Sequence, residues 1–345
     1  MNSCRLIAAA LGIFLFAGSS VLAAGPAAAT ALAWPPGLPV YDHVLIVIEE
    51  NKDYGQIIGD KHAPYLNRVR AEAANLTRMF GEEHHSQGNY FWLFSGSNQN
   101  VGFYDQVPTV PVKAPNLGAE LFRKGLTFGG YSENLPKVGS LIDWGKNPQG
   151  KTSYARKHNP WASFSFPPKN QLAGSANMPF SLFPTTEADF AKLPTVAIVV
   201  PGLKNDMHDG LIRKSIPRGD EWLRDHINAY YQWAKSHNSL LIVTWDENDD
   251  QYDKLHPAGI TVVGLTDPFA STKTAKGRSI QNRVATILAG AHIKPGDYPE
   301  GKGVTHVNLL RTLEAMYGLP RAGAQQPHAL NGGIRDDYII TDIFQ

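Results

Sequence analysis

Four short runs of apolar, mostly β-branched residues recur along the chain. They are HVLIVI at residues 43–48, TVAIVV at residues 195–200, LLIVTW at residues 240–245 and AGITVVG at residues 258–264. A continuous apolar run of this length is typical of a strand that is buried on both faces of a sheet. The pattern therefore predicts buried strands at these four places.

Helical periodicity separates these runs. Apolar residues recur at helical spacing in residues 63–74, 117–124, 221–236 and 307–317. Strands that alternate with helices predict an α/β fold with a central, mostly parallel sheet flanked by helices. Residues 136–184 are rich in Pro, Asn, Ser and Lys and show little periodicity, so we expect an irregular insertion that helps to wall the functional site.

The N-terminal residues have the composition of an export signal. Arg5 is followed by an apolar run at residues 6–17, and the Val-Leu-Ala sequence at residues 21–23 fits the small-x-small rule for cleavage. We therefore expect residues 1–23 to be a signal peptide, with an uncleaved membrane anchor as the alternative. The expected location of the mature protein is the periplasm or the extracellular space.

Composition limits what the rest of the chain contains. Residues 24–39 are rich in Ala, Gly and Pro and predict a flexible lead-in, and residues 40–345 are expected to form a single catalytic domain. The 32 basic and 31 acidic side chains nearly balance, which argues against a nucleic-acid binder. The single cysteine, Cys4, lies in the predicted signal peptide, so any metal ion must be held by Asp, Glu, Asn, Ser or His.

Acidic residues follow two of the predicted strands directly. The first strand runs into Glu-Glu-Asn at residues 49–51, and the third runs into Asp-Glu-Asn-Asp-Asp at residues 246–250. Ligands of open α/β sheets bind just beyond the carboxyl ends of the strands, and hard cations prefer oxygen ligands. The two clusters thus suggest one metal site, although acids after strands also occur in plain polar loops and helix caps.

A candidate nucleophile lies between these clusters, in the segment HHSQGNYFWLFSG at residues 84–96. Ser86 follows two histidines and precedes an apolar stretch that suits a helix. The N-terminus of a helix attracts phosphate through its free N–H groups and its dipole, and contact with a metal ion makes a serine hydroxyl nucleophilic. The alternative is a helix-capping serine with surface histidines beside it.

Three further histidines stand in settings that suit a site. His208 lies between two acids in NDMHDG at residues 205–210, His158 lies in the insertion, and His306 directly precedes a predicted helix. Each is compatible with phosphate contact or metal ligation, and each is also compatible with a structural role.

Taken together, these motifs resemble the bacterial phosphoesterase family, which contains acid phosphatases and phosphatidylcholine-type phospholipases C. The resemblance rests on an ordered set of motifs rather than on any single one. They lie at residues 43–54, 57–59, 63–67, 86–96, 131–136, 157–160, 205–210, 219–220, 245–248, 306–318 and 341–344.

That family is similar to the wider alkaline phosphatase superfamily. The resemblance implies an alkaline-phosphatase-like α/β fold with a divalent metal ion at the carboxyl edge of the sheet. The metal ligands it implies are Glu50, Asn51, Ser86, Asp246 and Glu247. Oxygen ligands fit Mg, Ca or Mn, and participation of histidine would admit Zn or Fe.

The resemblance also implies the catalytic and binding residues. The implied catalytic residues are the nucleophile Ser86 together with Asn89, His208 and His306. The implied substrate-binding residues are His85, His158 and Asn159. Two residues depart from the family pattern, because His85 and Gly88 replace prolines; proline pre-sets the backbone, so we expect a less rigid loop here. The bulky pair at residues 91–92 replaces smaller residues and is expected to pack in the core.

The function implied is that of a secreted, metal-dependent acid phosphatase that hydrolyses small phosphomonoesters through a phosphoserine. A protonated histidine, His208 or His306, would donate to the leaving oxygen, which favours activity below about pH 6.5. A phospholipase C or another phosphodiesterase, which would act on phospholipid, is the first alternative. A secreted binding protein without activity is the second. We expect no nucleic-acid or protein partner.

Overall fold

The structure is a computed structural model, and it describes residues 34–83, 85–99, 105–165, 174–249, 282–299, 303–323 and 337–345. The expected signal peptide, most of the lead-in and the expected strand at residues 258–264 lie outside the described residues. Residues Trp34–Gln345 belong to one compact unit. Within the described ranges, no helix is both long enough and apolar enough to cross a bilayer.

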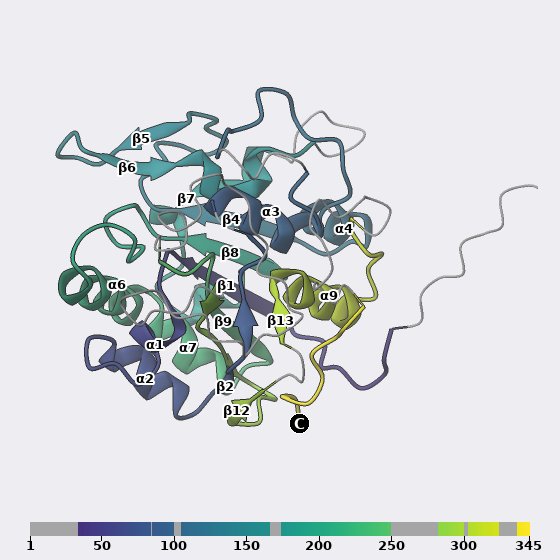
Figure 1. Ribbon diagram of the computed structural model, residues 1–345. Helices are drawn as coiled ribbons and strands as arrows, with labels where there is room; N and C mark the ends of the chain where they lie inside the picture. The colour runs from purple at the N-terminus through teal and green to yellow at the C-terminus, as the bar shows by residue number, and fades with distance from the viewer. Residues whose placement is uncertain are drawn as a thin grey trace, which may run out of the picture. The chain divides into compact units, whose positions relative to one another are not determined.

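The centre of this unit is an eight-stranded sheet in the order β12-β2-β11-β9-β1-β8-β4-β7 (Figure 1). Its strands are β1 (His43–Glu49), β2 (Ala74–Leu76), β4 (Phe128–Ser132), β7 (Asn177–Pro179), β8 (Val196–Val200), β9 (Ser239–Trp245), β11 (Thr286–Gly290) and β12 (Gly296–Tyr298). From β9 to β7 all neighbours are parallel, whereas β11 is antiparallel to both β9 and β2. The expected α/β fold with a mostly parallel central sheet is confirmed.

Two smaller sheets accompany the central one. The first has the order β10-β3-β13, and the second is the hairpin of β5 and β6. Their strands are β3 (Met79–Phe80), β5 (Trp144–Lys146), β6 (Thr152–Ala155), β10 (Arg283–Val284) and β13 (Val304–Thr305).

Helices pack in two groups, which lie to either side of β1 and β8 in the view of Figure 1. One group contains α3, α4 and α9, and the other contains α2, α6 and α7. The α-helices are α1 (Tyr54–Ile57), α2 (Pro64–Arg70), α3 (Ser86–Ser95), α4 (Leu117–Arg123), α5 (Glu187–Phe190), α6 (Ile212–His226), α7 (Asn228–Ala234) and α9 (His306–Tyr317). The 3-10 helices are η2 (Arg156–His158), η3 (Pro160–Ala162), η4 (Gly174–Ala176) and η5 (Phe180–Leu182).

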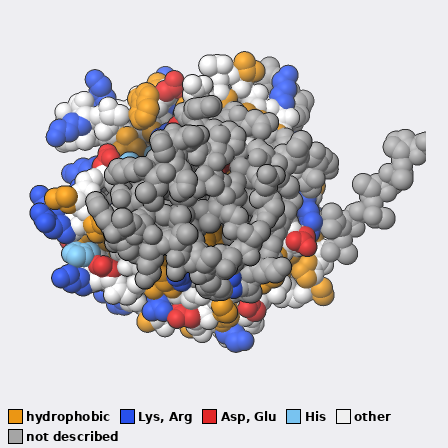
Figure 2. Space-filling view, in the orientation of Figure 1, with side chains coloured by type: hydrophobic (Ala, Val, Ile, Leu, Met, Phe, Trp, Pro, Cys, Tyr) orange, Lys and Arg blue, Asp and Glu red, His pale blue; other side chains and the backbone are white. Residues whose placement is uncertain are grey.

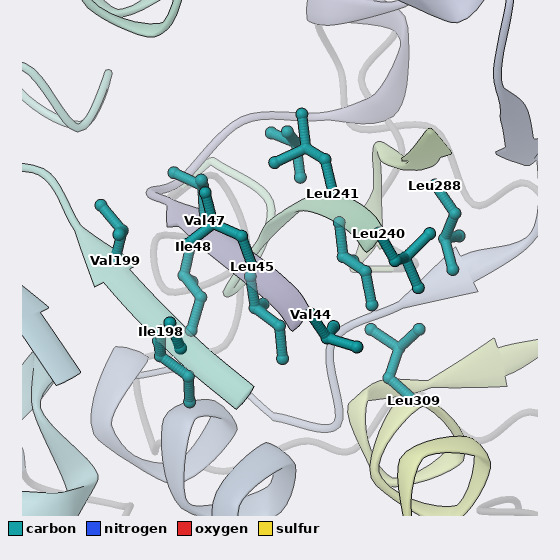
Figure 3. Close-up of a cluster of buried hydrophobic side chains, with 14 of the residues drawn as sticks. Val44, Leu45, Val47, Ile48, Ile198, Val199, Leu240, Leu241, Leu288 and Leu309 are labelled. Carbon is teal, nitrogen blue, oxygen red and sulfur yellow. The ribbon is translucent and has the colours of Figure 1, made fainter. Parts of the chain in front are cut away.

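The core forms around β1, whose apolar residues are buried on both faces of the sheet. Figure 3 shows Val44 and Leu45 of β1 among side chains from β8, β9, β11 and α9. Both side chains are 1% exposed or less. Full burial of an aliphatic side chain stabilises the fold by about 2 kcal/mol, so this run fixes the centre of the sheet.

Two elements differ from the sequence prediction. The helix expected at residues 221–236 is two helices, α6 and α7, and α6 begins earlier, at Ile212. Pro217 lies inside α6, and because proline usually ends a helix, the pattern had placed the start after it. The insertion at residues 136–184 is more regular than expected, since it contains the β5–β6 hairpin and β7, the outermost strand of the central sheet.

Candidate active site

Two acidic pairs, Glu49–Glu50 and Asp246–Glu247, lie next to each other at the carboxyl ends of β1 and β9. β1 and β9 are parallel, and Glu49 pairs with Trp245 in register, so Glu50 and Asp246 are the next residues on neighbouring strands. The backbone N–H of Asn51 donates to Asp246 Oδ1 at 3.1 Å. Asn51 has a φ of 48°, in the left-handed region that asparagine tolerates better than most residues. The tight turn after β1 is therefore tied to the turn after β9.

Ser86, the first residue of α3, lies against both acidic turns. Its Oγ is 3.0 Å from Glu50 Oε2 and 3.3 Å from Glu247 Oε1, and the residue is only 3% exposed. A serine hydroxyl carries one proton and cannot donate to two carboxylates at once. One of these contacts therefore requires either a protonated carboxyl group or a cation between the oxygens.

The residue before α3 has a backbone that proline cannot adopt. His85 has a φ of 80°, whereas the proline ring fixes φ near about −65°. The backbone N–H of His85 also donates to Glu247 Oε2 at 3.1 Å, and proline has no such donor. The departure from the family pattern at this position thus has a structural reason.

Glu83 explains the second departure, at Gly88. A side chain at Gly88 would collide with the Glu83 carboxylate, which occupies the space where the Cβ atom would stand. The Asn89 side chain accepts from the Glu83 N–H at 3.0 Å and donates to the Glu83 carbonyl at 2.7 Å. Asn89 therefore braces the turn before α3, and its expected contact with phosphate stays a prediction.

Tyr90, which was not among the predicted site residues, holds Glu50. Its hydroxyl donates to Glu50 Oε1 at 2.5 Å, and its ring stacks on His158 with the centroids 5.2 Å apart. His158 Nε2 lies 3.3 Å from the same Glu50 oxygen. The signal for Tyr90 was its position one helical turn after Ser86, which places both residues on one face of α3.

His158 and His208 differ in charge because their burial and their charged neighbours differ. His158 is 3% exposed, and desolvation with the charge of Lys157 holds its pKa well below the ordinary value, so its ring is neutral. His208 is partly exposed. Burial lowers its pKa, but the charge of Glu50 and the hydrogen bond with Asp209 outweigh this and raise the pKa above the ordinary value. His208 is therefore the better proton donor of the two.

His306 is fully engaged behind the site. Its Nδ1 lies 2.6 Å from Glu82 Oε2, and its Nε2 donates to the carbonyl of Trp245 at 2.8 Å. The other oxygen of Glu82 accepts the backbone N–H of Val307 at 2.8 Å. The structure therefore gives His306 contacts that position the end of β9, the strand that leads into Asp246.

Asn159 and His85, both predicted to bind substrate, differ in access. Asn159 is fully buried and donates to the Tyr154 hydroxyl at 2.9 Å, which is a structural contact. His85 is partly exposed at the start of α3. His85 is the more accessible of the two side chains, and the expected substrate contacts of both residues stay predictions.

The carboxyl groups of the site are buried together and resist ionisation. Desolvation and the charge of Asp246 raise the pKa of Glu50 well above its ordinary value. Desolvation, with the charge of Glu247, raises the pKa of Asp246 to about 8. Among the described residues, the buried Asp246 Oδ2 has no hydrogen-bond partner. Carboxylates so arranged need either protons or a cation to balance them.

The donor set has the chemistry of a hard-cation site. Glu50, Asp246 and Glu247 offer carboxylate oxygens, while Asn51 and Ser86 add an amide and a hydroxyl oxygen, all at adjoining positions. Oxygen donors of this kind suit Mg, Ca or Mn. In the described part of the chain, no three His, Cys, Asp or Glu side chains already converge as metal ligands. The fit is thus one of donor type and proximity.

Comparison with known proteins adds a family and a fold. Residues 60–320 match the Phosphoesterase family. The chain is 41% identical over 289 residues to a phosphatidylinositol-3-phosphatase of Mycobacterium tuberculosis, a match that covers 83% of this chain and 80% of that protein. It is 25% identical over 288 residues to an acid phosphatase of Aspergillus fumigatus, covering 79% of this chain and about half, 54%, of that protein.

The fold is shared with a solved structure of low sequence identity. A protein of the alkaline phosphatase superfamily from Vibrio parahaemolyticus superposes with a TM-score of 0.52 at 10% identity. The match covers 84% of this chain and 72% of the other. The expected alkaline-phosphatase-like fold is therefore confirmed.

Proposed function

The chain belongs to the Phosphoesterase family and is a hydrolase that acts on phosphate esters, and we propose that it cleaves phosphomonoesters through a phosphoserine at Ser86. One observation carries this proposal. The Ser86 hydroxyl lies at the N-terminus of a ten-residue helix, within 3.0 Å and 3.3 Å of two buried carboxylates. The helix N-terminus favours an anion there, and the carboxylates can take up the serine proton.

The reaction divides into two displacements at phosphorus. In the first, the Ser86 Oγ–P bond forms, the ester P–O bond breaks, and the serine proton passes to whichever of the two neighbouring carboxyl groups, Glu50 or Glu247, is ionised. In the second, water attacks the phosphoserine and gives a proton to the His208 ring, the Oγ–P bond breaks, and the carboxyl group returns its proton to Ser86 Oγ. Both steps use the same in-line geometry, so α3 and the two acidic turns serve each of them.

His208 is the proton donor to the leaving alcohol in this proposal. Its raised pKa keeps the ring protonated at mildly acidic pH, and it is partly exposed, so a substrate can approach it. His158 is held neutral by burial, and both ring nitrogens of His306 are already engaged. Protonation of His208 supports an acid phosphatase, because activity then falls as pH rises through its pKa.

A divalent cation is part of the proposal. Glu50, Asn51, Ser86, Asp246 and Glu247 would hold it, since these residues adjoin one another and Asp246 Oδ2 lacks a hydrogen-bond partner among the described residues. When bound, such a cation supplies Lewis-acid activation of the serine hydroxyl and of the phosphoryl oxygens. The protein's own groups position Ser86, hold Glu50 through Tyr90 and donate the proton from His208.

Export to the periplasm or the extracellular space completes the proposal. It is supported by the signal-like composition of residues 1–23. The N-terminal sequence of the protein recovered outside the cytoplasm tests it, and the expected sequence begins after Ala23.

Ser86→Ala tests the function, with Ser95→Ala as the matched control. Ser95 is buried at the other end of α3, where its Oγ lies 2.9 Å from the carbonyl oxygen of Phe91 and 3.0 Å from that of Ser97. Loss of the nucleophile is expected to lower kcat on p-nitrophenyl phosphate at least about a thousandfold, while Ser95→Ala keeps activity. Comparable activity in the two variants would refute the proposal.

The same wild-type preparation distinguishes the rival activities. It is assayed on p-nitrophenyl phosphate, on a phosphoinositide monophosphate and on phosphatidylcholine. Release of inorganic phosphate from the monoesters alone is the expected result. Release of phosphocholine from phosphatidylcholine would instead identify a phospholipase C.

A further inference from the structure

Exposed apolar side chains gather in one segment of the insertion. Val138, Leu141, Ile142 and Trp144 are 45%, 40%, 40% and 59% exposed, and we call these four residues the apolar patch. Monomeric proteins seldom expose several large apolar side chains together unless the surface meets a partner or a membrane. The patch therefore requires an explanation that the catalytic proposal does not supply.

The backbone that carries the apolar patch is held firmly. The N–H of Gly139 donates to the carbonyl of Asn177 at 2.8 Å, and the Asn177 amide donates back to the carbonyl of Ser140 at 2.8 Å. Arg156 donates to the carbonyl of Leu141 at 2.6 Å. The side chains of the patch thus stay exposed although the segment beneath them is fixed.

Lysines flank the apolar patch. Lys137 precedes it, and Lys146 and Lys151 follow it on the β5–β6 hairpin; all three are exposed. From residue 137 to 151 the sequence contains one acid, Asp143, and that carboxylate lies 3.4 Å from Arg156. Figure 2 shows basic side chains beside hydrophobic ones at the upper left, over β5 and β6. This surface is therefore both apolar and positively charged.

Trp144 and Lys146 share one face of the hairpin. Both are exposed while Gly145 between them is buried, as the alternation of a strand requires. Tryptophan favours the boundary between water and lipid, where its ring is in apolar surroundings and its N–H stays solvated. A lysine that lies beside such a tryptophan is at the depth of the lipid headgroups, where it is attracted to anionic ones.

The hairpin connects directly to the candidate active site. β6 leads into η2, whose last residue, His158, lies 3.3 Å from Glu50. The carbonyl of Ser153 in β6 accepts the N–H of Leu203, and its hydroxyl accepts the Asn134 amide at 2.6 Å. The hairpin is thereby fastened to the loops that follow β8 and β4, at the carboxyl edge of the sheet.

We propose that the apolar patch and the lysines beside it bind the surface of an anionic phospholipid membrane. This rests on the proposed function and deepens it, because the preferred substrate is then a phosphate monoester in the headgroup of a membrane lipid. The choice of a lipid surface follows from the charge. Three lysines complement anionic headgroups, at about fivefold in binding for each lysine, while the apolar side chains enter the interface.

Vesicle sedimentation tests the proposal directly. The full chain is mixed with vesicles of phosphatidylcholine alone or of phosphatidylcholine with phosphatidylserine, neither of which carries a phosphomonoester. We expect binding to the anionic vesicles that weakens with salt, and much weaker binding to phosphatidylcholine. Equal binding to both vesicles, or no binding, overturns the proposal.

Matched variants assign the binding to this surface. Leu141→Ser/Trp144→Ser and Lys146→Glu/Lys151→Glu are each expected to weaken vesicle binding at least about tenfold. Their controls are Leu182→Ser, an exposed leucine elsewhere, and Lys61→Glu/Lys294→Glu, which makes the same change of charge at other exposed lysines. Wild-type binding in the patch variants would overturn the proposal.

Activity separates this inference from the proposed function. The patch variants should keep wild-type turnover of soluble p-nitrophenyl phosphate and lose turnover of a lipid phosphomonoester in anionic vesicles. Equal loss on both substrates, or on neither, contradicts the role of the patch. A wild-type protein that hydrolyses neither substrate contradicts the proposed function. Vesicle binding needs no catalysis, so it tests the membrane-binding surface whether or not the protein is active.

Discussion

At the scale of single residues, the Glu50 side chain joins three other side chains of the candidate site. Ser86 and Tyr90 both donate to its carboxylate, and His158 lies beside it. Desolvation and the charge of Glu50 raise the pKa of Tyr90 well above its ordinary value, so the phenol remains a donor at any relevant pH. Tyr90 thus fixes one Glu50 oxygen and leaves the other for the serine.

Tyr90→Phe is expected to lower kcat about tenfold to a hundredfold. Tyr90 orients Glu50, a proposed metal ligand, and removal of a group that orients a metal ligand has effects of this size. Tyr154→Phe is the control, since Tyr154 is a buried tyrosine whose hydroxyl accepts from Asn159. Steady-state kinetics on p-nitrophenyl phosphate provides the measurement. If both variants retain the same activity, Tyr90 does not position Glu50.

The sequence predicted the places of some of these residues but not the roles of others. Glu50 and Asp246 followed buried strands directly, and parallel strands bring their ends together, so their proximity was predictable from pattern alone. The roles of Tyr90 and Glu83 were not, because each depends on a side-chain contact whose geometry no spacing rule encodes. His306 illustrates the converse, since its place before a helix suggested a ligand contact while both its nitrogens bond to the protein.

At the scale of the element, the start of α3 is set by three unusual positions. His85 has a positive φ, Gly88 leaves room for the Glu83 carboxylate, and Asn89 ties down the Glu83 backbone. The replaced prolines suggested a looser loop, but these contacts supply an alternative restraint. Position 88 accepts no side chain while Glu83 keeps its present place.

A double-mutant cycle measures this restraint. Gly88→Ala is expected to destabilise the fold by about 2 kcal/mol or more, because the new methyl group meets a buried carboxylate. In a Glu83→Ala background the same change should cost much less, since the obstructing group is gone. Urea unfolding of the four proteins gives the coupling free energy. Additive effects would show that the two residues do not compete for space.

At the scale of the whole molecule, buried carboxyl groups make stability depend on pH. Desolvation raises the pKa of Glu83 from 4.5 to about 8. The folded protein therefore holds a proton that the unfolded chain releases above pH 4.5. The associated stability is fully present below that pH and is lost as pH rises toward 8. Glu50, Asp206 and Asp246 have pKa values raised in the same direction.

Glu83→Gln removes the contribution of this group. The variant is expected to lose less stability than the wild type between pH 5 and pH 8, by up to about 4 kcal/mol. Urea unfolding at several pH values measures the difference between the two curves. Glu72→Gln, at a solvent-facing carboxylate with a lowered pKa, should not flatten the curve. Parallel curves for Glu83→Gln and the wild type would contradict the raised pKa.

The proposed cation predicts a second effect on overall stability. A cation that binds the folded state at a hundred times its Kd stabilises it by about 2.7 kcal/mol. We therefore expect Tm to rise with added Mg, Ca or Mn after treatment with a chelator. In Asp246→Asn/Glu247→Gln the rise should disappear. A Tm that no divalent cation changes would contradict the cation site.

The architecture as a whole was predictable because burial dictates it. The apolar runs specified β1, β8 and β9, and helical periodicity specified α2, α4 and α9. Where burial gave no signal, prediction was poorer: the β5–β6 hairpin and β7 arise inside a segment without periodicity, and Pro217 concealed the first turns of α6. The apolar patch lies in that same segment, so its location came from the structure alone.

Trapping of the intermediate tests the central claim most directly. The protein is mixed with a phosphomonoester and quenched in acid within a single turnover. It is then digested with a protease, and the masses of the peptides are measured by mass spectrometry. We predict one phosphoryl group on the peptide that contains Ser86, and none in Ser86→Ala. Phosphate release without a phosphoprotein, or phosphate on a different residue, would contradict the role assigned to Ser86.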